Sequence, residues 1–444
     1  MNSPVPFTGD LVAAPAPAPR SPRFDEAVFA ELCSVVFSPL HRSDQRRKGA
    51  EYVRGLLSAR GRKSIRKIAS VVGGPAAGQS LHHFVAGSTW DWDPVRRALA
   101  NHLVRMAPPQ AWVVRPLIIP KEGDRTVGVD RRFVPSLGQV VNAQHAVGVW
   151  GASEAVSYPV NWRLYLPEAW VEDAPRRTRA AIPDETEVET LGACVVHACQ
   201  TVVRDWSLPA RPMVLDARDG NLLHVVPRLH AAGTGLLVRV TGTLPVLAVM
   251  PRPAGRGAAG PQTVWQVVES VGRMRHPIVR EDGSTELAVV IPVRLPPHLG
   301  PSSPDADEPA LHLLATGRPG GPWPQETWLT NLADARPATL LRLTRLVERV
   351  ERDFEATGEQ VGIRDFAGRS FGGWHRHVTL ASAAHAVAVL SRTASHPWDL
   401  PGTLRAPVAM RNRGAAPHGS PKDAVPVGFP GRGAVAASRS RADR

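Results

Sequence analysis

The sequence predicts a mixed α/β protein in which an all-helical N-terminal region precedes a sheet that a β-rich insertion interrupts. Three observations lead to this fold class. Apolar residues recur at helical spacing from Phe24 to about Met106, strand-like runs follow Pro108, and helix and strand patterns alternate after Glu185. The 444 residues provide for about two or three folded units.

The N-terminal region is expected to comprise a disordered Pro/Ala-rich stretch, residues 1–22, and a helical domain, residues 23–106. In FDEAVFAELCSVVF the apolar residues return every four positions, as on one face of a helix. In STWDWDPVRRALANHLV a Ser/Thr or Asp cap precedes a proline and an apolar-periodic run, a pattern typical of a helix start.

Residues 107–245 read as the first part of the sheet domain. Four strand-like runs are expected to form an antiparallel meander with a first turn at residues 121–124: AWVVRPLII, DRTVGVDRRFV, QVVNAQHAVGVW and SYPVNWRLYLP. A helix over ETEVETLGACVVHACQTVVRDW, a short strand in RPMVLDA, another helix and a strand in LLVRVTG complete this part.

Residues 246–325 look like a β-rich insertion, with short strands predicted in TVWQVVESV and LAVVIPVRL beside Pro/Gly-rich stretches. Residues 326–398 return to helical periodicity, with helices expected at Thr339–Arg352 and over HVTLASAAHAVAVLS. Residues 399–444 are basic and of low complexity, which predicts a disordered tail.

The net charge of +13 indicates a polyanionic partner, and the distribution of the charge is more informative than its sum. Between residues 42 and 67 cations far outnumber acids. Such a cluster is expected where a protein contacts phosphate backbones, although a solvated basic face has the same composition. The candidate DNA-binding residues are Arg42, Arg46, Arg47, Lys48, Arg60, Arg62, Lys63, Arg66 and Lys67.

Several classes of protein are disfavoured. No apolar run approaches the ~20 residues of a membrane-spanning helix, and MNSPVPFTGD lacks the order of a signal peptide. Three cysteines are too few for a disulfide framework, and none has the spacing of a zinc site. We therefore expect a cytoplasmic protein with reduced thiols, associated with the nucleoid through DNA.

Two acids stand where chemistry is expected. Asp216, in RPMVLDARDGN, ends a short apolar strand before Gly220, the place where open α/β sheets bind ligands, although helix capping would explain it equally well. Glu351 lies on a predicted helix rich in Glu and Arg, where most acids are simply solvated.

Five segments together resemble the DDE transposases of bacterial insertion sequences, which have an RNase H-like catalytic domain. The resemblance covers residues 24–395 and rests on these motifs: SDQRRKGAEYVRGLLSARGRKSI, WDWDPVRRALA, VNWRLYLPEAW, VLDARDGN and GWHRHVTLASAAHA. It implies an RNase H-like mixed sheet and a DNA cleavage and strand-transfer reaction in which three carboxylates hold two Mg²⁺ or Mn²⁺ ions.

By this resemblance Asp216 and Glu351 match the second and third carboxylates, and so are the implied metal ligands. The family's Tyr, Arg and Lys around that Glu are replaced by Thr344, Val347 and Gly358. The first carboxylate is missing as well, since Arg115 stands at its position in WVVRPLIIPKEG, followed by Pro116 where the family has an acidic neighbour.

An arginine at a metal-bridging position repels a dication instead of binding it, so the cleavage site is predicted to be degenerate. If the strands around residues 121–124 form a hairpin, Asp130 lies opposite Arg115. Two hypotheses follow: Asp130 forms an ion pair with Arg115, or it is a substitute metal ligand. Because Pro116 lacks a backbone donor, we also expect a bulge or an interruption of the strand there.

Other candidates have plainer interpretations. Tyr165 and Trp170 are expected to be packing residues. For His375 and His377, a role in capping, packing or phosphate contact is favoured over metal binding. Asp219 is a second acid near Asp216, best read as a loop residue.

The predicted function is that of a transposase-like protein that binds double-stranded DNA at element terminal repeats, as a homodimer, and cleaves it poorly or not at all. Two alternatives stay open. The first is a working, unusual transposase that uses Asp216, Glu351 and Asp130. The second is a non-catalytic DNA-binding regulator, or an inert remnant, derived from a transposase.

Overall fold

A computed structural model describes residues 24–134, 138–218, 223–249, 260–280, 282–299 and 310–395, all within one compact unit, Met1–Leu400. The segments predicted to be disordered, 1–22 and 399–444, lie outside the described residues. Among the described residues, no helix combines the length and apolar character needed to span a bilayer. Cys33, Cys194 and Cys199 are buried and free.

Between residues 24 and 106 the regular elements are helices, as the periodicity predicts. Asp25 caps the first of them by accepting hydrogen bonds from Ala27 and Val28, and Asp91 caps α5 through the Asp93 amide. The helices are α1 (Glu26–Val36), α2 (Ser43–Ser58), α3 (Ile65–Val72), α4 (Pro75–His82) and α5 (Trp92–Met106).

A mixed sheet follows, and its first part is built around β1 (Ala111–Pro120), which pairs antiparallel with β3 (Gln139–Ala152) and parallel with β5 (Met213–Asp216). On one side β3 continues to β4 (Ser157–Leu164) and β2 (Val129–Val134); on the other, β5 continues parallel to β6 (Leu236–Val240). The order β4-β3-β1-β5-β6, with parallel pairing from β1 onward, is consistent with a DDE/RNase H-like fold.

The helices between these strands are α6 (Glu168–Val171), α7 (Ala174–Ala180), α8 (Leu191–Gln200) and α9 (Val225–Ala231). The predicted strand-helix-strand unit over RPMVLDA and LLVRVTG is thereby confirmed. The expected hairpin between the first two strands is wrong, because β1 and β2 both pair with β3 and not with each other.

The same sheet extends into residues 246–325, the region expected to be an insertion. Its elements are β7 (Pro245–Ala248), β8 (Gln262–Thr263), α10 (Val264–Ser270), β9 (His276–Val279), β10 (Thr285–Arg294), β11 (Leu311–Gly317) and β12 (Glu326–Thr330). The strand predicted over TVWQVVESV is a helix, since Thr263 and Gln266 form a reciprocal capping box that outweighs the β-propensity of the valines.

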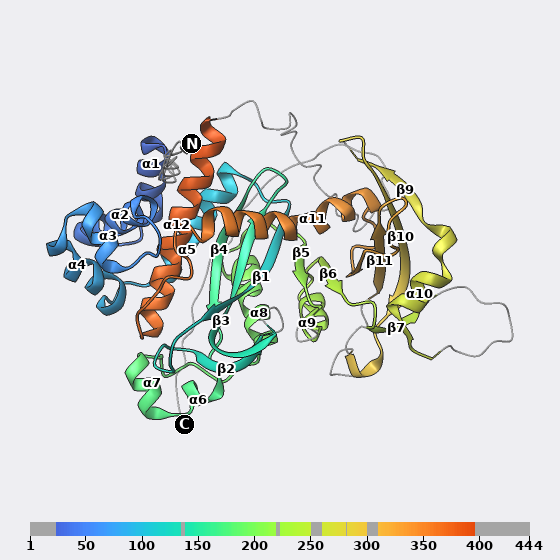
Figure 1. The fold of residues 1–444 in the computed structure, drawn as a ribbon, viewed down its shortest axis with the longest axis horizontal. Coiled ribbons are helices and arrows are strands. Elements are labelled where there is room, and N and C mark those ends of the chain that lie inside the picture. Colours follow the sequence, from blue (N-terminus) through green and yellow to red (C-terminus); the bar gives the residue numbers. More distant parts are fainter. Residues whose placement is uncertain are drawn as a thin grey trace, which may run out of the picture. The chain divides into compact units, whose positions relative to one another are not determined.

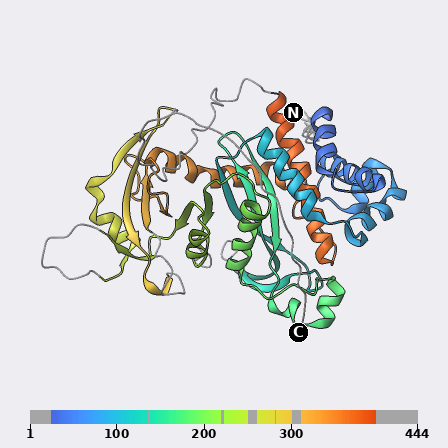
Figure 2. The same cartoon turned by 180° about the vertical axis from the view of Figure 1, so that it is seen from behind.

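Two long helices complete the described chain, α11 (Pro337–Asp353) and α12 (Phe371–Ser395). Helix α12 packs against α1, α2, α5 and β4, so the N-terminal helices share a core with the sheet. Helix α11 contacts β1 and β5, and it covers one face of the sheet while α8 covers the other (Figures 1 and 2). This arrangement brings Glu351 on α11 to Arg115 in the middle of β1, next to the point where the pairing of β1 with β5 ends.

Candidate active site

Arg115, in the middle of β1, and Asp216, the last residue of β5, occupy neighbouring positions just beyond the last pair of the β1–β5 ladder. Val114 of β1 is the register partner of Leu215 of β5, so the next residues, Arg115 and Asp216, follow on strands about 4.8 Å apart. Register neighbours on adjacent strands point to the same face of a sheet. The position expected from the resemblance to hold the first carboxylate therefore lies beside Asp216.

Arg115 forms an ion pair with Glu351. Its Nη2 donates to Glu351 Oε2 at 2.8 Å, and its guanidinium carbon lies 3.7 Å from the centroid of the Phe354 ring. The residue is 8% exposed, and burial lowers its pKa while Glu351 raises it. A guanidinium stays charged in proteins, so Arg115 holds a fixed positive charge against the carboxylate of Glu351.

A second arginine reinforces this arrangement. Phe354 opens a π-helical turn, Phe354–Gly358, that extends α11, and Arg364 lies over its ring at 4.9 Å from the centroid. Arg364 also pairs with Glu359 at 3.1 Å. Phe354 thus contacts two guanidinium groups, each matched with one glutamate.

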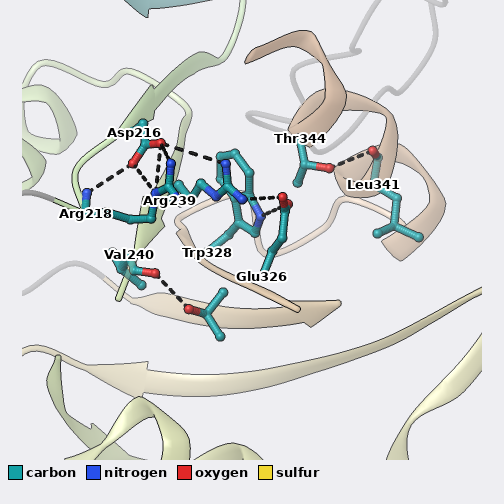
Figure 3. A network of polar contacts seen from close by, with 9 residues as sticks. Asp216, Arg218, Arg239, Val240, Glu326, Trp328, Leu341 and Thr344 are labelled. Atoms are coloured by element: carbon teal, nitrogen blue, oxygen red, sulfur yellow. Dashed lines mark hydrogen bonds and ion pairs between the residues drawn. The ribbon is translucent and has the colours of Figure 1, made fainter. Parts of the chain in front are cut away.

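Asp216 is engaged by arginines too (Figure 3). Arg218 donates from Nη2 to Asp216 Oδ2 at 2.7 Å and from Nε to both carboxylate oxygens at 3.0 Å. Arg239 of β6 lies 3.8 Å from Asp216 Oδ2 and also pairs with Glu326, which accepts from Trp328 Nε1 at 3.0 Å. The hydrogen bonds to Asp216 raise the pKa of Arg218.

These contacts do not fit a pair of divalent cations. Four acids (Asp216, Glu326, Glu351 and Glu359) face four arginines (Arg115, Arg218, Arg239 and Arg364) in these ion pairs. Two dications need a surplus of carboxylates, and here every acid already has a guanidinium. In the described part of the chain, no group of three His, Cys, Asp or Glu side chains is arranged to hold a metal.

Both hypotheses for Asp130 are wrong. Asp130 lies opposite Ala143 of β3, whereas Arg115 lies opposite Gly148, five residues further along the strand (143 to 148), or about 16 Å. The two residues also flank opposite sides of β3. Asp130 instead accepts from the Arg131 amide and lies near Arg132, so it neither pairs with Arg115 nor joins Asp216.

The expected disruption at Pro116 is also wrong, because β1 runs through it without a register shift. The amides of Trp112 and Lys121 explain this: Trp112 donates toward β5, to Pro212 O, and Lys121 donates toward β3, to Asn142 O. Amides alternate along a strand, so Pro116 would direct its N–H to the β5 side, where the ladder has ended at Val114. The missing donor therefore costs no hydrogen bond, as on an edge strand.

Most of the first half of the basic cluster is already engaged. Arg42 pairs with Asp44 at 2.9 Å, Arg47 and Lys48 both reach Glu51, and Arg46 donates to the backbone carbonyls of Leu40 and His41. Lys63 requires a correction as a DNA contact. It is 5% exposed, and its ammonium donates to Ala59 O, so it supports the loop from inside.

The other cations of the cluster remain available. Arg60, Arg62, Arg66 and Lys67 are exposed, and none forms an ion pair with a carboxylate of the described residues. We call these four residues the 60–67 basic segment. Arg62 lies close enough to Lys121, after the end of β1, to add to the lowering of the pKa of Lys121 to about 8, which burial mainly causes.

The remaining candidates are structural. His375 stacks on Trp92 with ring centroids 4.7 Å apart, and His377 contacts Tyr52 Oη at 3.0 Å and Gly362 O at 2.8 Å. Trp170 is buried and donates to Val129 O, and Tyr165 packs under Arg132. Asp219 lies outside the described residues.

Sequence reasoning missed the partners of the acids. Arg218 carries a local signal, since it follows Asp216 by two residues in the DAR triplet. Arg239, Glu326 and Phe354 carry none, because only the strand register and the position of α11 bring them to the site.

Comparison with known proteins agrees with this architecture. A family model described as DDE superfamily endonuclease matches residues 35–274. The chain belongs to the DDE superfamily of endonucleases. It is also similar to a probable transposase for insertion sequence element IS701 from Microchaete diplosiphon, with 30% identity over 120 residues, or 26% of this chain and 30% of that protein. The chain thus matches less than a third of that transposase. DDE superfamily endonucleases generally depend on divalent metals, and transposases act on DNA.

Proposed function

We propose that this DDE-superfamily chain is a transposase-type DNA-binding protein whose cleavage site is inactivated. The observation that carries the proposal is the Arg115–Glu351 ion pair, in which the first acidic position supplies a cation that neutralises the third. Asp216, the second position, is bound by Arg218 and approached by Arg239. No step of metal-dependent cleavage is assigned to this arrangement.

The proposed DNA-binding surface is the 60–67 basic segment. Its four exposed cations lie at and before the start of α3, whose cap is Ser64. Exposed arginines without acidic partners are free to contact phosphates, in contrast to Arg42, Arg47 and Lys48. Element terminal repeats are the proposed target, and a homodimer is the proposed assembly on them.

The alternative function is that of a non-catalytic regulator, or an inert remnant, that retains the DNA-binding surface. The arginines paired with Glu351 and Asp216 favour a regulator or a remnant over a working transposase. Intact inverted repeats flanking the gene would favour recent mobility.

Replacing Arg60, Arg62 and Arg66 together by Gln is expected to weaken DNA binding at least tenfold at low salt. It should also reduce the slope of log affinity against log salt by about 2 to 3, since each lost phosphate contact removes about 0.9. Fluorescence anisotropy with a short duplex measures both quantities. The matched control replaces Arg105, Arg179 and Arg318, which are also exposed and have no ion pair with a described residue. Equal slopes for the two triple variants would reject this surface.

A further inference from the structure

Helix α11 carries a row of arginines that the site does not use. Arg342, Arg345, Arg349 and Arg352 follow one another at intervals of three and four residues, so they share one side of the helix. At 100° per residue, Arg342 and Arg349 point roughly 160–180° away from Glu351. The row therefore faces away from Arg115.

This row lines a cavity of about 530 Å³ together with Arg280, beyond β9, and Arg336, which precedes α11. Three of the six arginines are neutralised: Arg280 pairs with Asp282 at 3.2 Å, Arg345 with Glu286 at 2.6 Å and Arg349 with Asp353 at 2.9 Å. Of these pairs, Arg345–Glu286 joins α11 to β10, and the other two are local.

The other three, Arg336, Arg342 and Arg352, are exposed and have no ion pair with a described residue. Against them the lining offers one further acid, Glu154. Among the described residues of the lining, three arginines and one glutamate thus leave a surplus of two positive charges. An anionic ligand would complement this surplus.

Guanidinium groups bind phosphate and carboxylate oxygens in a bidentate manner, so the spacing of the arginines decides between the possible anions. Arg342 and Arg352 are ten residues apart, about 15 Å along the helix, which corresponds to roughly four base pairs of axial rise in a DNA duplex. A single small phosphate would leave most of this row unmatched, whereas a sugar-phosphate backbone matches its length.

We call the cavity lined by Arg336, Arg342 and Arg352 the arginine groove of α11. We propose that this groove is a second DNA-binding surface, which contacts the phosphate backbone of a duplex away from Arg115, Asp216 and Glu351. The proposal rests on the proposed function in taking DNA as the partner. It adds a surface on a different element from the 60–67 basic segment and on another side of α11 from Glu351.

The test compares Arg336→Gln, Arg342→Gln and Arg352→Gln, combined in one full-length chain, with the Arg105, Arg179 and Arg318 control variant. The probe is a short fluorescent blunt-ended duplex, measured by anisotropy over a salt series. We expect the groove variant to bind at least tenfold more weakly than the control at low salt, with a salt slope smaller by about 2 to 3. Circular dichroism melts establish that both variants remain folded.

Equal affinity and equal slope for the groove variant and the control would overturn the proposal. The variant of Arg60, Arg62 and Arg66 separates this failure from that of the proposed function. Loss of binding in the groove variant alone would reject the 60–67 basic segment and retain the groove. Loss of binding in the Arg60, Arg62 and Arg66 variant alone would reject the groove and retain the 60–67 basic segment.

Discussion

Arg115→Asp is expected to bind Mn²⁺ at least tenfold more tightly than the unaltered chain. The substitution changes the local charge by two units and frees Glu351, so three carboxylates at neighbouring positions replace an ion pair. One unit-charge contact at ~4 Å is worth ~4 kcal/mol at an effective dielectric of about 20, and tenfold in affinity requires only about 1.4 kcal/mol. Isothermal titration calorimetry with MnCl₂ measures the difference.

Arg115→Asn is the matched control, because it removes the guanidinium without adding a carboxylate. We expect Arg115→Asn to bind Mn²⁺ more weakly than Arg115→Asp. If the two variants bind Mn²⁺ equally, position 115 does not lie where a metal ligand is needed, and the assignment of the site fails.

Arg96→Ala is expected to lower the free energy of unfolding by about 3–5 kcal/mol, because it leaves buried acceptors without a donor. Arg96 lies on α5 and is 3% exposed. It donates to Trp162 O on β4 at 2.7 Å, and on α12 to His375 O at 3.0 Å and to Thr379 Oγ1 at 2.7 Å. Burial lowers its pKa to about 9. This one side chain therefore links the N-terminal helices to the sheet.

The neighbouring Arg97→Ala is the control, since Arg97 is exposed and its side chain has no hydrogen-bond partner among the described residues. It should change the free energy of unfolding by less than about 0.5 kcal/mol. Urea unfolding followed by tryptophan fluorescence measures both variants. A loss below about 1 kcal/mol in Arg96→Ala would mean that the buried network is not a structural link.

The sequence was sufficient for the elements with strong periodicity. The helices up to Met106, the strand that ends at Asp216 and α11 are confirmed, because apolar spacing and capping residues are local signals. The helix α10 was missed because its valines favour a strand, whereas two side chains, Thr263 and Gln266, start a helix.

Strand order could not be predicted with the same certainty. The chain of β1, β2 and β3 is compatible with a simple meander, but the long β3 pairs with both of the others. Because β3 lies between β1 and β2, Asp130 on β2 is remote from Arg115 on β1. The actual partner, Glu351, is 236 residues away in sequence, and only the packing of α11 on the sheet brings it to Arg115.

The chemistry at position 115 could be predicted from the sequence, and its structural consequence could not. The resemblance to the family placed Arg115 at the position of the first metal ligand. How the protein accommodates the charge depends on Phe354, Arg364 and Glu359, which lie on an irregular turn after α11 that has no sequence signature.

We infer that the Arg115–Glu351 ion pair abolishes metal-dependent cleavage. The most direct measurement is nicking of supercoiled plasmid that carries the terminal repeats of the element, with Mg²⁺ or Mn²⁺, by the unaltered chain and by Asp216→Ala. We predict no metal-dependent nicking by the unaltered chain above the level of Asp216→Ala. Metal-dependent nicking that Asp216→Ala abolishes would contradict the claim.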